Sequence, residues 1–109
     1  MADYHEHADL ARLKDLFALA KPEADGYLEL NKAFNREDGA IPKKYRELMA
    51  LAVSFTTQCP YCLDVHTAAA KRAGATREEV AEAAMIAATL RAGAAITHGT
   101  LALKLYDRT

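Results

Sequence analysis

The residues best suited to chemistry lie near the middle of the chain, where Cys59 and Cys62 form a C-x-x-C pair and His66 follows. Because proline is tolerated in the first turn of a helix, Pro60 predicts a helix that starts here and continues to about residue 73. Cys59, Cys62 and His66 then share one narrow face, since steps of three and four residues return to the same side. Two thiols at the positive end of a helix, with an imidazole one turn further on, predict a dithiol biased toward thiolate.

Residue chemistry alone leaves three interpretations of this cysteine pair. The first is a redox dithiol, which is the interpretation that the helix-start position favours. The second is a zinc site, whose fourth ligand would come from Glu47 or from a distant histidine. The third is a pair of inert core thiols, since free cysteine is often buried. The distant histidines are His5, His7 and His98.

Length and composition predict one soluble globular domain over residues 1–109. The chain has 109 residues, is 51% hydrophobic and 27% charged, and carries a formal net charge of -1. This balance favours neither a nucleic-acid partner nor an anionic membrane. The N-terminus is too polar for a signal peptide, and no run of 18 apolar residues occurs. We therefore expect a cytoplasmic protein, in a reducing compartment where closely spaced cysteines serve redox or metal chemistry.

Helical periodicity extends over almost the whole chain, and no alternating pattern typical of strands is present. The predicted fold is therefore all-α, a compact subunit of about six helices. Gly74 is a suitable residue to follow a helix, and Thr76 with Glu79 has the spacing of a capping box. Gly93 lies at an expected interruption. The predicted helices cover residues 9–20, 22–36, 43–56, 59–73, 76–90 and 94–106, and residues 1–8 are expected to be a flexible N-terminus.

The segment 76–90 is apolar on nearly all sides, and the segment after it is rich in alanine. Alanine lets helices approach closely, but each alanine buries little area. A helix that is apolar all round must be covered on several sides. We therefore expect the core to be completed against other copies of the same chain.

Glu47 lies within the apolar segment 43–56. Pattern alone favours a surface carboxylate that pairs with Lys43, one turn earlier on the same helix. A buried carboxylate near the cysteines is the alternative.

Taken together, Glu47, Cys59, Cys62 and His66 form the pattern E-x11-C-x-x-C-x3-H. This pattern resembles the signature of the alkylhydroperoxidase D-like (carboxymuconolactone decarboxylase) superfamily, and the resemblance covers about residues 25–106. It implies an all-helical subunit that assembles into hexamers built from dimers, or into trimers. It also implies a thiol-dependent peroxidase or disulfide reductase that uses no metal, haem or flavin, and that receives electrons from an external thiol or disulfide donor. The reductant protein is unidentified.

The resemblance also implies a role for each site residue. Cys62, the cysteine nearer the histidine, attacks the hydroperoxide, and Cys59 resolves the product as an intramolecular disulfide. Glu47 and His66 form the proton relay that activates the thiol, which replaces the surface interpretation of Glu47. Peroxidase members carry a second histidine at the position of Tyr61. A phenol with a pKa near 10 is a poor base at neutral pH, so Tyr61 is expected to have an auxiliary role.

Two other functions remain open. Members that decarboxylate the lactone generally lack the C-x-x-C pair, so decarboxylation is the least favoured activity for a chain with Cys59 and Cys62. A non-enzymatic oligomer, in which the cysteines hold a metal or sense redox state, is the alternative from a different class.

Overall fold

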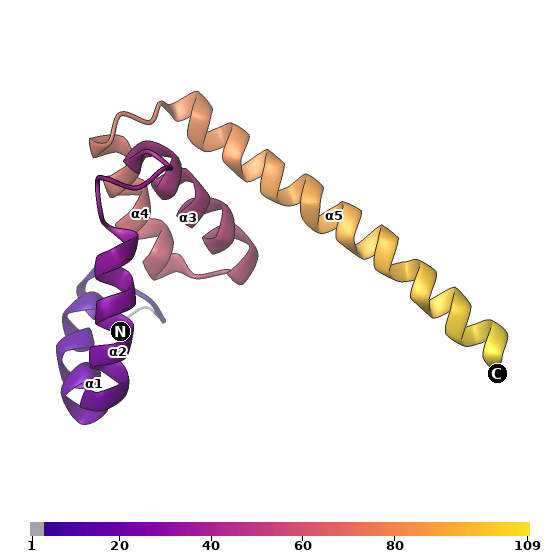
Figure 1. Cartoon of the computed structure of the whole chain (residues 1–109), viewed down its shortest axis with the longest axis horizontal. Coiled ribbons are helices and arrows are strands. Elements are labelled where there is room, and N and C mark those ends of the chain that lie inside the picture. The colour runs from indigo at the N-terminus through magenta and orange to yellow at the C-terminus, as the bar shows by residue number, and fades with distance from the viewer. Residues whose placement is uncertain (1–3) are drawn as a thin grey trace.

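The computed structural model describes residues 4–109, and every regular element within them is helical. The prediction of an all-α fold is therefore confirmed. A 3-10 helix, η1, leads into α1, and the pair α1 and α2 is followed by α3, α4 and a long α5 (Figure 1). The elements are η1 (His7–Arg12), α1 (Leu13–Leu19), α2 (Lys21–Phe34), α3 (Lys43–Thr57), α4 (Pro60–Arg72) and α5 (Arg77–Arg108).

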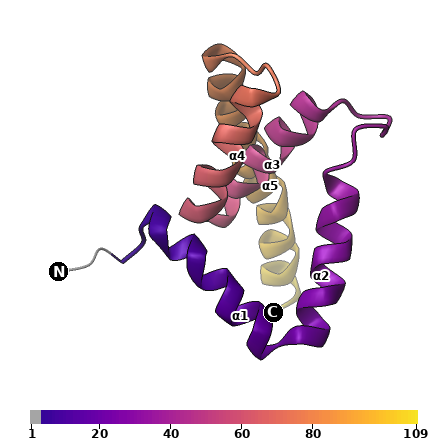
Figure 2. The same cartoon turned by 90° about the vertical axis from the view of Figure 1, so that its left-hand side faces the viewer.

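Helix α3 is the centre of the packing. It contacts α4 along one side and the first part of α5 along another, while α1 and α2 form a V beside them (Figure 2). Leu51 of α3 is fully buried, and the buried alanines lie on α2, α4 and α5. Small side chains let these helices approach closely, as the composition predicted. The buried alanines are Ala24, Ala70, Ala83 and Ala87.

The connection between α4 and α5 follows the local sequence closely. Gly74 has a φ of 96°, a backbone conformation that side chains with a Cβ rarely adopt. Thr76 then accepts a hydrogen bond from the backbone N–H of Glu79, whose carboxylate accepts one from the N–H of Thr76. This is the predicted capping box, and it fixes where α5 begins.

The expected interruption at Gly93 is absent. Residues Arg77–Arg108 form one continuous helix of 32 residues, so residues 4–109 contain five α-helices and a 3-10 helix instead of about six helices. A single glycine costs a helix interior only about 1 kcal/mol relative to alanine. The neighbouring alanines and leucines favour helix and no proline follows, so the break that the sequence predicted between 76–90 and 94–106 does not form.

The second half of α5 has no partner in the single chain. Every residue from 88 to 109 is exposed, and the helix projects away from the other helices (Figure 1). Large apolar side chains are among them. Within residues 4–109, α5 is also the one helix whose length and composition would suit a membrane span. Its exposed large apolar residues after Ala87 are Leu90, Ile96, Leu101, Leu103, Leu105 and Tyr106.

The N-terminus was expected to be flexible over residues 1–8. Residues 1–3 lie outside the part of the chain that the structure describes. From His7 onward the chain forms η1, which packs against α4. The side chain of His7 contacts Asp64 of that helix, with 2.6 Å between His7 Nδ1 and Asp64 Oδ2.

Candidate active site

A tight turn between α3 and α4 places the two cysteines. Gln58 closes α3 in a left-handed conformation with a φ of 56°, which allows the chain to reverse within one residue. Cys59 is then the N-cap of α4 and Pro60 its first residue, where the missing N–H has no cost. The backbone N–H of Cys62 donates to Cys59 Sγ at 3.2 Å. The helix start therefore directs an N–H group at sulfur.

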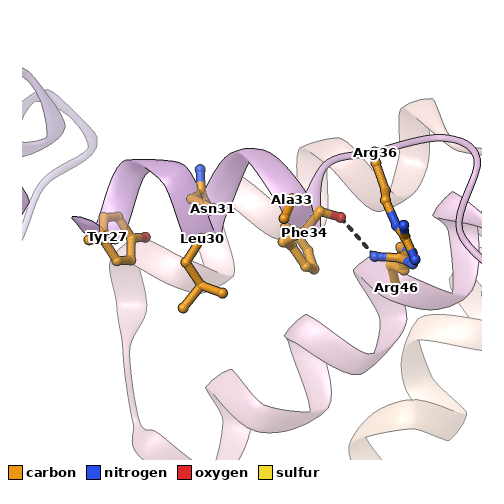
Figure 3. A pocket seen from close by; sticks show the side chains of 7 residues that line it. All are labelled: Tyr27, Leu30, Asn31, Ala33, Phe34, Arg36 and Arg46. Carbon is orange, nitrogen blue, oxygen red and sulfur yellow. Dashed lines mark hydrogen bonds between the residues drawn. The ribbon is translucent and has the colours of Figure 1, made fainter. Parts of the chain in front are cut away.

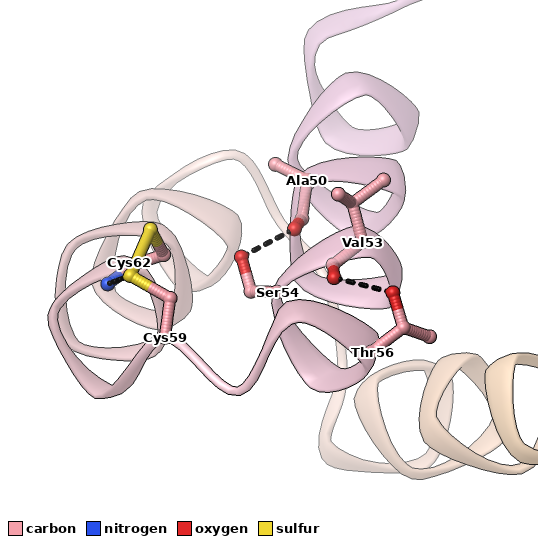
Figure 4. The surroundings of a disulfide bond; sticks show 6 residues. All are labelled: Ala50, Val53, Ser54, Thr56, Cys59 and Cys62. Atoms are coloured by element: carbon pink, nitrogen blue, oxygen red, sulfur yellow. Dashed lines mark hydrogen bonds between the residues drawn. A yellow bond between two sulfur atoms is a disulfide. The ribbon is translucent and has the colours of Figure 1, made fainter.

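Cys59 and Cys62 are joined as a disulfide, with their Cα atoms 5.3 Å apart (Figure 4). Both cysteines are half-buried. The two hydroxyls drawn beside them on α3 are engaged elsewhere, because Ser54 donates to the Ala50 carbonyl and Thr56 to the Val53 carbonyl, each at 2.7 Å. These hydroxyl protons are therefore directed to backbone oxygens of α3.

Glu47 is buried, with 1% of its surface exposed, and its carboxylate binds His66. The distance from Glu47 Oε2 to His66 Nδ1 is 2.7 Å. The ring of Phe34 stands edge-on to the imidazole, with ring centroids 5.8 Å apart, and limits its movement. Lys43, the partner expected from helix spacing, instead donates to the side chain of Asn35 at 3.0 Å. The interpretation of Glu47 as a surface carboxylate is wrong.

Tyr61 lies between the cysteines in sequence and is bound to the N-terminal turn. Its hydroxyl donates to Asp9 Oδ2 at 2.8 Å. This hydrogen bond, together with partial burial, raises the pKa of Tyr61. The backbone N–H of Glu6 and then the Tyr61 hydroxyl lower the pKa of Asp9. Sequence reasoning missed Asp9, since nothing local connects it to a residue 52 positions away.

One cavity of about 1020 Å³ brings all the predicted site residues together. Glu47 from α3 and the cysteine pair, Tyr61 and His66 from α4 all line it. The opposite wall is formed by apolar residues of η1, α1 and α2. The helical periodicity predicted apolar faces on these helices, but it did not indicate that they would line a cavity. That wall includes Leu10, Leu13, Leu16, Phe17, Tyr27 and Leu28.

A second, open cavity of about 460 Å³ lies along α2 and holds none of these site residues (Figure 3). Arg36 and Arg46 stand at one end of it. Arg46 donates to the backbone carbonyls of Phe34 at 3.2 Å and Ile41 at 2.8 Å. Its guanidinium therefore holds the connection between α2 and α3, and we assign it a structural role.

The histidines considered as additional zinc ligands are spread over the molecule. His5 lies edge-on to the ring of Tyr61 with centroids 6.4 Å apart, His7 contacts Asp64, and His98 is exposed on the distal part of α5. Within residues 4–109 no three His, Cys, Asp or Glu side chains are grouped as they would be to hold a metal ion.

Most of the sequence also matches that of a known protein family. The sequence model of the carboxymuconolactone decarboxylase family matches residues 23–105, most of the chain. The protein belongs to the carboxymuconolactone decarboxylase family. The matched range contains the cysteine pair, Glu47 and His66, and begins after η1 and Asp9.

Three proteins from other bacteria are similar to this chain in sequence. "Uncharacterized protein 4 in cox locus" of Paracoccus denitrificans is 45% identical over 83 residues, which are 76% of this chain and 74% of that protein. An uncharacterized protein of Cupriavidus necator is 34% identical over 65% of this chain and 63% of its own length. A Mycobacterium tuberculosis protein named alkyl hydroperoxide reductase is 34% identical over 62% of this chain, but the match spans only 20% of that protein.

Proposed function

We propose that this family member is a thiol-dependent peroxidase or disulfide oxidoreductase that uses Cys59 and Cys62. One observation carries the proposal: a buried Glu47 holds His66 one helical turn beyond Cys62, and all three line the cavity that contains the disulfide. A carboxylate–imidazole pair beside a thiol is the arrangement that removes a thiol proton at neutral pH.

The proposed reaction balances with the residues present and one external donor. The Cys62 thiolate attacks the hydroperoxide oxygen, which gives a Cys62 sulfenic acid and releases the alcohol once the leaving oxygen takes a proton. The Cys59 thiol then attacks the Cys62 sulfur, forming the disulfide and releasing water. An external dithiol reduces that disulfide and leaves as a disulfide itself. A disulfide substrate would enter at the same sulfur.

Proton transfer is assigned to His66 and Glu47. The imidazole accepts the Cys62 proton, and the carboxylate stabilises the imidazolium that forms. Tyr61 has a minor role because its hydroxyl already donates to Asp9 and its pKa is raised. This geometry supports the expectation that Tyr61 does not replace the basicity of a second histidine.

Family membership and one relative support an oxidoreductase. The relative named alkyl hydroperoxide reductase covers 62% of this chain. The family name would suggest lactone decarboxylation, but that reaction gives no role to a reversible disulfide. Decarboxylation therefore remains the least favoured activity.

Mass spectrometry of the thiols before and after one equivalent of peroxide tests the proposal. The reduced protein should lose two hydrogens as Cys59 and Cys62 join, and a dithiol should restore them. Unchanged thiols, together with one bound zinc per chain, would instead support the metal-binding or redox-sensing alternative.

We also propose that the working protein is a cytoplasmic homo-oligomer, most simply a hexamer, with a trimer or dimer as the smaller alternatives. The exposed apolar residues of α5, such as Leu101 and Leu103, support this because a single chain leaves them in water. Light scattering at micromolar concentration tests it, and a monomer would contradict it. No nucleic acid, membrane or cofactor has a place in the proposal.

A further inference from the structure

The chain has two apolar surfaces that cannot meet within one copy. The first is a stripe along the distal half of α5, where steps of three and four residues place five side chains on one face. All five are exposed. The stripe consists of Leu90, Ala94, His98, Leu101 and Leu105, and we call it the α5 stripe.

The second surface is the cavity wall opposite the disulfide. Leu13 and Leu16 of α1 are 42% and 59% exposed there, although they face the cavity. A cavity of about 1020 Å³ is far larger than a cysteine pair and a peroxide group require. Because α5 is one unbroken helix that leads away from α1 and α2, its distal half cannot fold back to fill this space (Figure 1).

The size of the cavity suits a segment of helix. With side chains, a helix is about 10 Å across, so about 13 Å of its length, or roughly nine residues, would occupy such a volume. Residues 97–105 make up that length and include the last three members of the α5 stripe.

We propose that the α5 stripe of a second copy docks in this cavity and places His98 of the partner subunit beside the Cys62 site. The inference rests on the proposed assembly and adds that each site is completed by another chain. Under a two-fold axis the contact is reciprocal, so each copy fills the cavity of the other and the buried area doubles.

A second copy fits these surfaces better than a bilayer would. The α5 stripe is interrupted by an imidazole, and Arg91 and Lys104 flank it on the same exposed half of the helix. The cavity offers polar partners to such a group, because Asn31 and Asn35 line it beside Glu47. Hydrocarbon would leave the imidazole without a partner.

His98 gains a chemical role from this position. Within residues 4–109 of one copy, His98 is exposed and makes no hydrogen bond or ion pair. Next to the cysteine pair, a second imidazole would favour the thiolate of Cys62 when it carries a proton. The partner's His98 is therefore a positioning residue for charge at Cys62, and its loss should slow the reaction of that thiol.

Mixed oligomers test this directly. The Cys62→Ser chain keeps His98 but lacks the thiol, and the His98→Ala chain keeps the thiol. Alone and reduced, His98→Ala should react with iodoacetamide at Cys62 about tenfold more slowly than wild type at pH 7. After the two chains are refolded together, with mixing verified by native mass spectrometry, the Cys62 rate should rise toward wild type, because the Cys62→Ser chain supplies the missing imidazole.

The same experiment separates this inference from the proposed peroxidase. Alkylation needs no peroxide, so recovery of the rate supports the shared site even if the oligomer does not consume peroxide. An identical Cys62 rate for His98→Ala alone and mixed, or no loss in His98→Ala, would overturn the shared site. Thr89→Ala, at an exposed position of α5 outside residues 97–105 and off the α5 stripe, is the control and should leave the rate unchanged.

A second measurement tests whether the α5 stripe docks on another copy, and it does not depend on His98. Leu101→Asp should convert the oligomer to smaller species by light scattering, with helix content by circular dichroism retained. An oligomer of unchanged size, or wild-type protein that co-sediments with phosphatidylcholine vesicles through α5, would contradict the proposed occupant.

Discussion

Glu47 and His66 come from different helices and are joined by a hydrogen bond of 2.7 Å between Glu47 Oε2 and His66 Nδ1, with the carboxylate 1% exposed. When Glu47 is ionised its carboxylate can only accept a hydrogen bond, and the contact then places a proton on His66 Nδ1. Nε2 is then the nitrogen that carries the lone pair. The buried acid therefore selects the tautomer in which His66 can receive a proton.

Replacing Glu47 by glutamine should separate this electrostatic role from packing. Glutamine keeps the shape but loses the charge that stabilises an imidazolium, so we expect turnover to fall by roughly ten- to a thousand-fold. The pH profile for alkylation of Cys62 should move to higher pH. The measurement is the iodoacetamide rate against pH, with Glu78→Gln, an exposed residue of α5, as the matched control. Superimposed curves for wild type and Glu47→Gln would exclude the relay.

The two cysteines should respond differently to serine. Cys62→Ser should abolish peroxide consumption, because the attacking sulfur is lost. Cys59→Ser should instead leave a trapped sulfenic acid or a mixed disulfide at Cys62, since the resolving thiol is absent. Mass spectrometry of each variant after peroxide distinguishes the two outcomes. Full activity in Cys62→Ser would show that the attacking residue has been assigned wrongly.

The Asp9–Tyr61 hydrogen bond should be visible in the alkaline titration of tyrosine. It raises the pKa of Tyr61 above 10.0, so its contribution to stability is complete below that pH and is lost as pH rises through the raised value. In Asp9→Asn the late-titrating phenol should move toward 10.0. Phenolate absorbance measures this, with Asp15→Asn as the control. Identical titrations of wild type and Asp9→Asn would show that the contact is not made.

The contribution of ionised Asp9 to stability should be lost at low pH. The pKa of Asp9 is lowered from 3.8, so its contribution is present above 3.8 and is lost as pH falls through the lowered value. The hydrogen bond that holds η1 to α4 should therefore be intact across the neutral range.

Tyr61→Phe should cost far less activity at neutral pH than Glu47→Gln.

A matched pair of glycine substitutions tests the continuous α5. Gly93 lies in the helix interior with open space around its Cβ position, so Gly93→Ala should stabilise the fold by about 0.5–1 kcal/mol. Gly74→Ala should destabilise it, because the φ of 96° at that position strains any residue with a Cβ. Thermal unfolding of both variants provides the measurement. Destabilisation by Gly93→Ala would point to a break in the helix or to a close contact there.

The sequence by itself determined the features that depend on neighbours along the chain. Pro60 after Cys59 set the start of α4, and the three- and four-residue steps placed Cys62 and His66 on one face, because helix geometry converts spacing into direction. Gly74 and the Thr76 capping box were equally local. Glu47 was identified through the family resemblance, since its own neighbours suggested a pairing with Lys43.

Only the tertiary structure decided which residues of different helices meet. Glu47 is hydrogen-bonded to His66, 19 positions away in the sequence, and Asp9 to Tyr61, 52 positions away. Such contacts depend on how the helices pack. The unbroken α5 was visible only in the structure, although its cause is local: one glycine costs too little to interrupt a long run of residues that favour helix. The tertiary structure also decided that the α5 stripe is exposed and that the cavity beside the disulfide stays open. Both follow because α5 leads away from the other helices.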